Sequence, residues 1–318
     1  MSSIFWQERG LLIDAVRKFF FQHKYTEVQT PIMVDLPGTE VHLDYFATQS
    51  AAEKNKTKYL RSSPELHLKK LLSQGMHRIF EIAPCFRNGR DIGPWHNPEF
   101  TMLEYYQTSM EFQEFIGLTK SLLQSVCEAF GSKSAISPAW LNANWHTITV
   151  PEAFETFAKI KLIDNDSDLA RKAIEAGVVS VQKKDDFETA YFKTLLERIE
   201  PQFEKLGGVV LYDYPPSQAA LAKVNDGWAK RFEIYIKGIE LCNGFEELAG
   251  VKENVERLRE TEAKRHELGK TVPAATDEEI KSWSHLPQCC GNALGFERLL
   301  ALLLNEKSIH RCLMSYVF

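Results

Sequence analysis

Residues 78–106 contain two strand-like stretches, RIFEIAPCFR at Arg78–Arg87 and FTMLEYY at Phe100–Tyr106. Each has the two-residue alternation of a β-strand, in which every second side chain lies on the same face. The polar segment Asn88–Pro98 between them contains glycine and proline, which favour loops. The sequence therefore predicts an antiparallel pair of strands joined by a long loop.

The segments around this pair show helix and strand patterns in turn. Apolar residues recur every three to four positions in 11–20, and the SPE sequence at 63–65 is a good helix start, because serine caps and proline fits the first turn. Residues 110–205 are predicted to be mostly helical. Further strands are expected at 209–212, 232–238 and 239–245, and a strand that runs into a helix at 291–300. Antiparallel strands interleaved with long helices predict the α+β class.

The composition is that of an ordinary globular protein. The 318 residues are 44% hydrophobic and 25% charged, and the net charge is −5. The longest apolar run, Leu299–Leu304, is far shorter than the ~20 residues that cross a bilayer, and residues 1–10 lack the apolar stretch of a signal peptide. We therefore expect a cytoplasmic protein without a membrane span. The acidic balance argues against an extended nucleic-acid surface, which is usually basic.

The common cofactor motifs are missing from the sequence. Six cysteines occur without the short spacing of zinc or redox motifs, so no metal cage is expected. The glycine-rich phosphate loop and the dinucleotide fingerprint are also absent. A nucleotide would have to be bound by another arrangement.

Polar residues on two of the predicted strands share faces. The two-residue period places Glu104 and Tyr106 together on one strand, and Asn243, Phe245 and Glu247 together on another. A carboxylate that faces the interior needs a positive partner, because an unpaired buried charge costs several kcal/mol. Two carboxylates, an amide, a phenol and an aromatic ring suit an alkylammonium ligand. The alternative is that these glutamates lie on a solvated face of the sheet.

Arg87 and Arg298 form a second candidate pair. Arg87 ends a strand before the long loop, and Arg298 begins a helix after two glycines. Arginine presents a rigid fork that binds phosphate or carboxylate, although a lone arginine more often forms a surface salt bridge. Glu233 and Glu240 lie on either side of a predicted turn at Gly238 and could converge on a hard cation.

Long stretches of the sequence resemble class II aminoacyl-tRNA synthetases, specifically the lysyl type. HNPEFTMLEYY at His96–Tyr106, preceded by FRN at Phe86–Asn88, resembles motif 2; GNALGFER at Gly291–Arg298 resembles motif 3; and EVQTP at Glu27–Pro31 resembles motif 1. SPELHLK at 63–69 and GIELCNGFEEL at 238–248 also match the lysyl pattern. The resemblance covers about residues 5–304. It implies a single catalytic domain over residues 1–318, an antiparallel sheet flanked by helices, and a helical insertion at about 110–205.

Within that class, the chain is similar to the lysyl-tRNA synthetase paralogues that ligate (R)-β-lysine to translation elongation factor P. Its motif-1 helix begins almost at Met1, so we expect no anticodon-binding domain and no tRNA anticodon binding. Ala293 also fits, because the tRNA synthetases tend to have glycine there, and one methyl group in a tight pocket shifts selectivity by ~1–3 kcal/mol. The resemblance implies an AMP-forming ligase that uses ATP and Mg²⁺, with (R)-β-lysine or lysine and elongation factor P as substrates. It also implies a homodimer with Pro31 at its interface.

The resemblance assigns roles to individual residues. Arg87 and Arg298 would be catalytic and would hold the α- and γ-phosphates of a bent ATP. The rest of the nucleotide site would be Asn88, Gly89, Asn97, Glu240, Leu241 and Gly295, and magnesium would be bound by Glu233 and Glu240. Ser63, Pro64 and Glu65 would face the amino group nearer the substrate carboxylate. The side-chain ammonium would lie among Glu104, Tyr106, Asn243, Phe245 and Glu247, above Ala293.

One position departs from the family pattern. After Phe-Arg-Asn the family usually has a glutamate that contacts adenine, and here Gly89 stands there. Asp91 could supply the carboxylate instead, or adenine could be read by the backbone alone. Two alternative functions also stay open. One is a free-standing enzyme that activates lysine for a tRNA or small-molecule acceptor; the other is a non-catalytic synthetase-like regulator.

Overall fold

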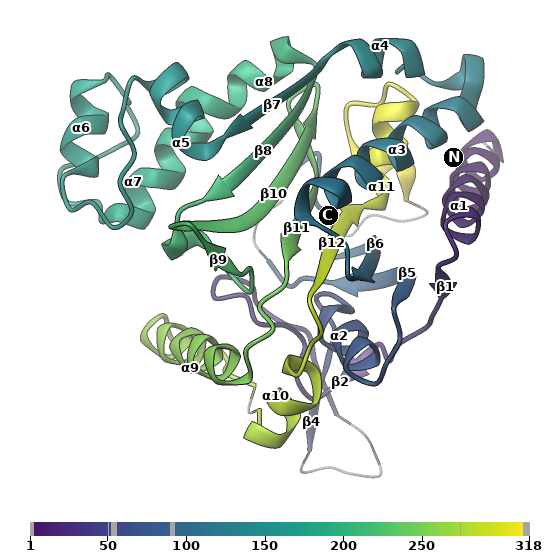
Figure 1. Ribbon diagram of the computed structural model, residues 1–318, viewed down its shortest axis with the longest axis horizontal. Helices are drawn as coiled ribbons and strands as arrows, with labels where there is room; N and C mark the ends of the chain where they lie inside the picture. The colour runs from purple at the N-terminus through teal and green to yellow at the C-terminus, as the bar shows by residue number, and fades with distance from the viewer. Residues whose placement is uncertain (1–2, 50, 52–55, 90–92, 274, 314–318) are drawn as a thin grey trace. The chain divides into compact units, whose positions relative to one another are not determined.

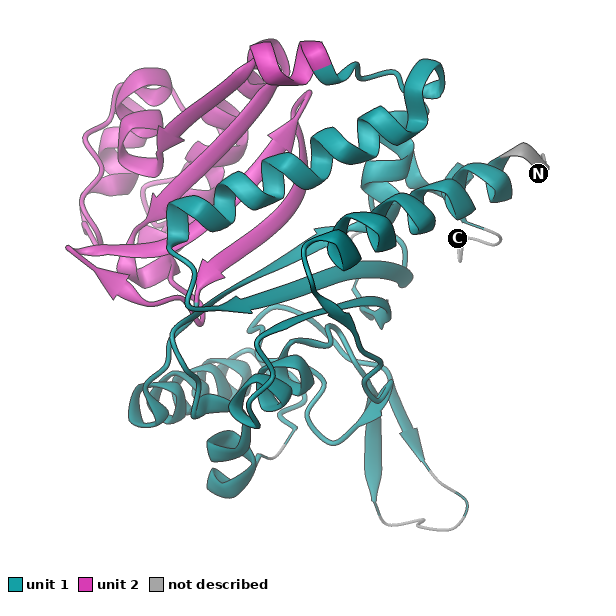
Figure 2. Ribbon diagram, turned by 45° about the vertical axis from the view of Figure 1, so that its right-hand side comes forward, with its two compact units in different colours: residues 1–138, 247–318 teal, residues 139–246 magenta. Residues whose placement is uncertain are grey.

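The computed structural model describes every residue except 1–2, 50, 52–55, 90–92, 274 and 314–318. The chain forms two compact units, residues 1–138 with 247–318 and residues 139–246 (Figure 2). The described residues form a mixed sheet of nine strands and a small sheet of three, with flanking helices (Figure 1), which confirms the α+β class. The interpretation of residues 1–318 as one catalytic domain stays a prediction.

The sheet of the first unit is built around the predicted antiparallel pair. β5 (Arg78–Phe86) pairs with β6 (Glu99–Thr108), and β12 (Cys289–Gly295) lies antiparallel on the other side of β6. β1 (Thr26–Glu27) runs parallel to β5, so the sheet is not purely antiparallel. The prediction of this strand pair is confirmed.

The register of these strands determines which side chains share a face. Glu104 lies opposite Glu81 on β5 and opposite Ala293 on β12. Since directly opposed residues point to the same side of a sheet, these three side chains share one face. Two residues further along, Tyr106 lies opposite Gly291 on that same face.

Helices cover both faces of this sheet. Tyr105 points one way and packs against the ring of Phe115, whereas Tyr106 points the other way and packs with Leu68 and Leu72. Figure 1 shows the two helices that carry these partners, α3 and α2, on opposite sides of β5 and β6. The helices of the unit are α1 (Ser3–Gln22), α2 (Glu65–Ser73), α3 (Phe112–Phe130), α9 (Val251–Glu267), α10 (Asp277–Ser284) and α11 (Phe296–Leu303), with short turns at Gly131–Lys133 and Ile309–Cys312.

A small three-stranded sheet precedes α2. Its strands are β2 (Met33–Val34), β4 (Thr57–Leu60) and β3 (Ala47–Gln49), with β4 in the middle. Arg61 follows β4 and is 1% exposed. Its guanidinium lies 2.8 Å from Glu81 Oε1 and 2.6 Å from Thr30 Oγ1, and it also donates to the carbonyl of Pro84. Arg61 thereby ties the small sheet to β5.

The strands of the second unit belong to the same nine-stranded mixed sheet. β10 (Trp228–Ile236) pairs antiparallel with β8 (Gly208–Tyr214), with β11 (Ile239–Glu246) and with β9 (Val224–Asn225), and β7 (Trp145–Thr149) runs parallel to β8. β10 and β11 meet at Lys237 and Gly238, whose φ angles of 51° and 78° are those that a tight two-residue hairpin needs. Both strands of this hairpin were predicted.

The helices of the second unit fall in the stretch that was predicted to be mostly helical. β7 interrupts that stretch, and its short, half-exposed sequence WHTIT has no strong strand pattern. Buried residues of β8 and β10 form a core with apolar side chains of the helices, which lie between Val150 and Phe203 in the sequence. The elements are α4 (Pro138–Ala143, from the end of the first unit), α5 (Val150–Ala153), η2 (Phe154–Ala158), α6 (Leu169–Glu175), α7 (Phe187–Thr194), η3 (Leu195–Ile199), α8 (Glu200–Leu206) and η4 (Pro216–Gln218).

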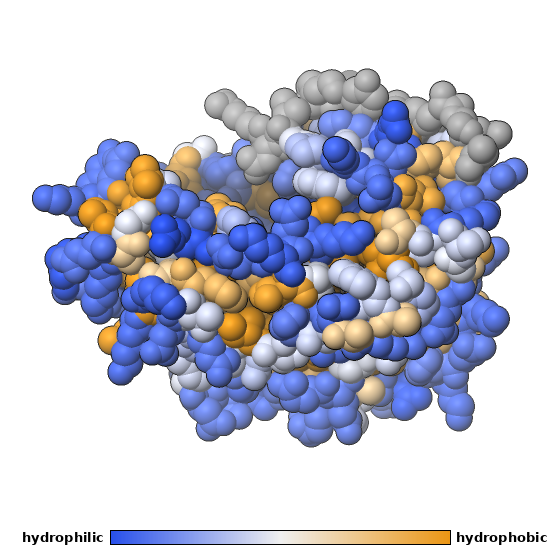
Figure 3. Space-filling view, turned by 90° about the horizontal axis from the view of Figure 1, so that it is seen from above, coloured by the Kyte–Doolittle hydropathy of each residue, from blue (hydrophilic) through white to orange (hydrophobic). Residues whose placement is uncertain are grey.

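On the face seen in Figure 3 most side chains are hydrophilic, and apolar side chains gather in small areas among them. Within the described residues, no helix has both the length and the apolar character needed to span a bilayer.

The buried ion pair of Arg61 and Glu81 gives a test of the fold. Replacing Arg61→Met leaves the Glu81 carboxylate buried beside only Thr30, so we expect the free energy of unfolding to fall by about 3–5 kcal/mol. Arg17→Met is the matched control, because the Arg17–Glu27 pair is 44% and 28% exposed and should contribute less than about 1 kcal/mol. Chemical denaturation measures both, and equal losses would contradict this account.

Candidate active site

The start of α2 is joined to β6 through one serine. Ser63 Oγ accepts a hydrogen bond from the backbone N–H of Glu65 at 3.0 Å. The same hydroxyl donates to Glu104 Oε1 at 2.5 Å. The N-cap residue itself is Pro64, one residue after the predicted serine, and it makes no side-chain capping bond. Pro64 contributes its carbonyl, which accepts from the N–H of Leu68 in the first turn. The Ser63 hydroxyl therefore connects the start of α2 to the Glu104 carboxylate on β6.

Glu104 and Tyr106 lie in the interior, on the face that the two-residue period predicted. Their side chains are buried, with exposures of 0% and 3%, and Tyr106 donates to Glu104 Oε2 at 3.1 Å. The alternative of a solvated sheet face is therefore wrong for Glu104. A carboxyl group held this far from water requires either a proton or a cation.

Glu247 lies in the same cluster, beside a lysine that the sequence analysis did not select. Lys69 Nζ is 2.6 Å from Glu65 Oε1 and 2.7 Å from Glu247 Oε2, and the Lys69 and Glu247 side chains are each 1% exposed. Among the described residues, Glu247 Oε1 has no hydrogen-bond partner although it is buried. That oxygen is free to accept a hydrogen bond from a ligand. We call Ser63, Glu65, Lys69, Glu104, Tyr106 and Glu247 the carboxylate cluster.

Burial dominates the protonation of this cluster. Burial, followed by the charge of Glu65, raises the pKa of Glu104 to about 8, although hydrogen bonds from Ser63 and Tyr106 oppose the rise. Burial also raises the pKa of Glu247, against the attraction of Lys69. Burial alone would lower the pKa of Lys69, but the carboxylates of Glu247 and Glu65 outweigh it, so the net shift is upward and Lys69 stays charged. A cation that enters the cluster would favour ionised Glu104 and Glu247.

β12 leaves space in front of the cluster because its residues on this face are small. A Cβ atom on Gly291 would collide with the ring of Tyr106 and with Glu247 Oε1, so no larger residue fits there without a shift. Ala293, opposite Glu104, is half-buried and packs beside Met102. The predicted position of Ala293 on the floor beside Glu104 agrees with this register.

The two predicted arginines lie against one short segment of the first unit. The backbone N–H of Arg87 donates to the carbonyl of Pro98, and its guanidinium lies 5.1 Å from the ring centre of Phe100. Arg298, in the first turn of α11, has Nε 3.4 Å from the Trp95 carbonyl and Nη2 3.1 Å from His96 Nε2. Both side chains are partly accessible, so either can bind an anion.

The other predicted nucleotide contacts of this unit lie near that segment. Asn97 is buried and donates to the carbonyl of Glu99, and Asn88 is exposed with its N–H bonded to the carbonyl of Asp44. Gly89 is exposed, Gly295 immediately precedes α11, and Asp91, the alternative adenine contact, lies outside the described residues. The contact to adenine therefore stays a prediction.

The second unit holds the two predicted magnesium ligands. Both oxygens of Glu233 are already hydrogen-bonded, to Arg231 and to the Tyr235 hydroxyl, each at 2.6 Å. Glu240 is half-buried on β11 opposite Tyr235. Glu233 in this arrangement does not fit a magnesium ligand unless Arg231 gives up an oxygen. In the described part of the chain no group of three or more metal-ligating side chains is placed to hold an ion, and magnesium binding stays a prediction.

The remaining predicted residues of the second unit lie on β11. The Asn243 side-chain oxygen accepts from Arg231 Nε at 3.2 Å, which links it to Glu233 through one guanidinium. Leu241 is buried, and Phe245 packs against the core of this unit. Arg231 is thus a second residue that the sequence analysis missed.

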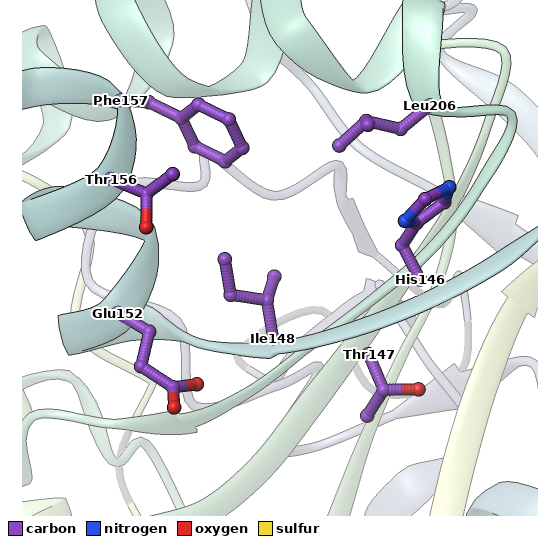
Figure 4. Close-up of a pocket in the computed structure, with 7 residues that line it drawn as sticks. All are labelled: His146, Thr147, Ile148, Glu152, Thr156, Phe157 and Leu206. Carbon is purple, nitrogen blue, oxygen red and sulfur yellow. The ribbon is translucent and has the colours of Figure 1, made fainter.

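A cavity of about 390 Å³ occurs elsewhere in the second unit (Figure 4). Its only carboxylate is Glu152, which is bonded to Thr149 in the cap of α5. The cavity contains none of the predicted site residues, and its lining offers no unpaired buried charge. Its lining residues are His146, Thr147, Ile148, Glu152, Thr156, Phe157 and Leu206.

Two of the missed residues had a signal in the sequence. Lys69 lies four residues after Glu65, within the same apolar stripe as Leu68 and Leu72, where a charged residue is unusual. Gly291, Ala293 and Gly295 recur every second residue, so one face of the strand carries no large side chain. Neither pattern shows which partner would be buried against it.

Comparisons with known proteins agree with the fold. The sequence matches the family of class II tRNA synthetases (D, K and N) over residues 2–314, and the chain belongs to that family. The elongation factor P–(R)-β-lysine ligase of Vibrio cholerae is 33% identical over 314 residues, which is 96% of this chain and 93% of the relative. The ligase of that name from Mannheimia succiniciproducens is 34% identical, with coverages of 95% and 91%. A homologue of the ligase in Aquifex aeolicus is also 34% identical, with coverages of 93% and 94%.

The raised pKa of Glu104 predicts a pH-dependent stability. In the folded protein Glu104 keeps its proton up to about pH 8, whereas its ordinary pKa is 4.5, so its contribution to stability is lost as the pH rises through that interval. Glu104→Gln removes this dependence. We expect the free energy of unfolding of the variant, minus that of the wild type, to increase by up to about 1.4 kcal/mol per pH unit between pH 5 and 8.

Chemical denaturation of the ligand-free protein at several pH values measures this difference. Glu175→Gln is the control, because Glu175 is exposed in an ion pair with Arg171 and should show no such trend. A constant difference between Glu104→Gln and the wild type across this pH range would contradict the assignment.

Proposed function

We propose that this protein is an ATP-dependent ligase that activates (R)-β-lysine as an aminoacyl-adenylate and transfers it to a lysine ε-amino group of translation elongation factor P. The observation that carries the proposal is the carboxylate cluster, in which buried Glu104 and Glu247 need a cation to be ionised at neutral pH and one Glu247 oxygen is unbonded. The relatives that bear the name of this ligase, and that align with nearly the whole chain, support the same reading.

The residues of the first unit suit the first half of the reaction. A carboxylate oxygen of the amino acid attacks the α-phosphorus of ATP, the bond to the bridging oxygen breaks, and pyrophosphate leaves. Arg87 and Arg298 would stabilise the charge on the phosphate oxygens, and magnesium would supply further positive charge there. The cluster would hold the amino groups, so that positioning rather than a covalent nucleophile of the protein drives the step.

In the second half, the neutral amine of the acceptor lysine attacks the carbonyl carbon of the adenylate. An amide bond forms, AMP leaves, and the departing phosphate is a suitable acceptor for the amine proton. We further propose that the enzyme acts in the cytoplasm and that it does not bind a tRNA anticodon.

We also propose that the protein is a homodimer. The helix before the segment that resembles motif 1, and the two residues directly after that segment, expose large apolar side chains, which supports an interface there. Phe21 and Met33 are each 53% exposed, Trp6 is 44% exposed and Ile32 is 37% exposed.

Intact-mass spectrometry of elongation factor P tests the function directly. After incubation with this protein, ATP and (R)-β-lysine, we expect elongation factor P to gain the mass of one lysyl group, and α-lysine to be used less well. Arg298→Ala should lower ATP–pyrophosphate exchange by about 100-fold or more, because an electrostatic contact to the transition state is lost. Glu175→Ala, at an exposed site, is the control.

The alternatives give different results in the same assay. Charging of a tRNA with lysine, with elongation factor P unmodified, would indicate a free-standing lysyl-adenylate-forming enzyme. No pyrophosphate exchange with either lysine isomer would indicate a non-catalytic regulator. Either result would overturn the proposal.

Ala293 predicts which isomer is preferred. Its methyl group shares the face of Glu104, so Ala293→Gly should enlarge the floor and shift the ratio of kcat/KM toward α-lysine by roughly 10-fold. Pyrophosphate exchange with both isomers measures the ratio. An unchanged ratio would show that this methyl group does not contribute to selectivity.

A further inference from the structure

Lys69 is a buried cation inside an acidic site that is expected to bind a cation. Its Nζ contacts one oxygen of Glu65 and one oxygen of Glu247, at 2.6 and 2.7 Å. Only 1% of its side chain is exposed, whereas the next residue on α2, Lys70, is exposed. A helical Glu–Lys pair four residues apart is usually a surface feature of little energetic weight. The burial of this pair therefore calls for a reason other than helix stability.

The contacts of Lys69 leave the far side of Glu247 available. Lys69 holds Oε2, while Oε1 is buried with no partner in the described part of the chain. Gly291 leaves open the space in which that oxygen lies, because a Cβ atom there would collide with it. Lys69 therefore holds one oxygen of the Glu247 carboxylate and leaves the other available to a ligand.

We propose that Lys69 is a positioning residue that keeps Glu247 ionised and aimed at an ammonium group of the amino acid, and that it thereby selects substrates with two ammonium groups. This inference rests on the proposed function. It adds a residue that acts through Glu247 and has no contact with the reacting atoms.

The charges of the cluster agree with such a substrate. Glu65, Glu104 and Glu247, when ionised, contribute three negative charges, and Lys69 reduces the sum to minus two. A diamino acid carries two ammonium groups, and its own negative charge is consumed when its carboxylate is adenylated. Without Lys69 the cluster would carry one charge more than this ligand neutralises, and a buried excess charge is removed by protonation.

The titratable groups around Glu247 define what loss of Lys69 would do. On α2 they are Lys69 and Glu65, and on β6 the group is Tyr106, which donates a hydrogen bond to Glu104. Burial already raises the pKa of Glu247, and Lys69 is the partner that opposes the rise. A buried glutamate without a cation has a pKa of about 8–9, so it is only about 1–10% ionised at pH 7. With Lys69 present the pKa of Glu247 is about 7, so about half of Glu247 is ionised at pH 7. Removing the charge of Lys69 should therefore weaken ammonium binding by roughly 5–50-fold at pH 7.

The experiment compares Lys69→Gln, which keeps a hydrogen-bond donor and loses the charge, with Lys69→Arg, which keeps the charge. Lys70→Gln is the matched control on the same helix. Calorimetry measures binding of lysine and of norleucine, which lacks the side-chain ammonium, from pH 6 to 9. For Lys69→Gln we expect weaker lysine binding at pH 7, recovery as the pH rises, and release of about half a proton more on binding at pH 7 than the wild type releases.

Lys69→Gln should also lose most of the preference for lysine over norleucine, while the KM for ATP in pyrophosphate exchange stays within about twofold. Lys69→Arg should restore part of the affinity, and Lys70→Gln should behave as the wild type. If Lys69→Gln does not fold, the Lys69→Arg variant still tests the inference, because a variant that keeps the charge should release as many protons on binding as the wild type.

Three results would overturn the inference. Lysine affinity and proton release of Lys69→Gln could match the wild type, or its losses could be independent of pH and equal for lysine, norleucine and ATP, as a purely structural role predicts. Lys69→Arg could release more protons than the wild type despite its charge. Failure of the proposed function is distinguishable, because the wild-type protein would then leave elongation factor P unmodified in the mass-spectrometry assay, whereas failure of the Lys69 inference alone leaves that modification intact.

Discussion

The site depends on the cost of keeping charged groups away from water. Glu104, Glu247 and Lys69 are almost completely buried, and an unpaired charge in such a place costs several kcal/mol. The structure meets this cost in two ways, by a proton on Glu104 below about pH 8 and by the contact of Glu247 with Lys69. Neither solution saturates the cluster, because one oxygen of Glu247 is left unbonded. A cationic ligand would supply a hydrogen-bond donor for this oxygen. The missing donor is the physical basis of the proposed specificity.

Further buried ionic contacts make the frame around this cluster rigid. Arg61 joins Glu81 and Thr30 on the sheet face that carries Glu104. On α11, Glu297 accepts from Arg9 of α1 and from the backbone N–H of Thr101 on β6, which fixes the first turn of the helix that carries Arg298. Breaking a buried pair of this kind costs more than its formation contributes. The network therefore serves to specify one arrangement of strand and helix more than to add stability.

Much of the fold was predictable because local patterns and tertiary packing agree. The strands β5, β6, β10, β11 and β12 were predicted from alternation and turn residues, and the start of α2 from the SPE sequence at 63–65. The short strand β7 was missed, because its half-exposed sequence lacks a period that distinguishes it from helix or loop. The parallel pairing of β1 with β5 also had no local signal, since two residues carry too little pattern. Part of the site was also predictable from local patterns. Parity placed Glu104 and Tyr106 together, yet Glu233 lies bonded to Arg231 and Tyr235, a state that no spacing along one strand reveals.

By itself, the sequence determined the α+β class, the motifs of a class II synthetase and the face on which Glu104 and Tyr106 lie. These follow from periodicity and from residue identity, which are local properties. Only the tertiary structure decided that Lys69 is buried between Glu65 and Glu247, and that Gly291 keeps the space before Glu247 open. Protonation and selectivity depend on distances between residues far apart in the chain and on their separation from water. Neither quantity is encoded at any single position, so both appear only when α2, β6 and β12 pack together.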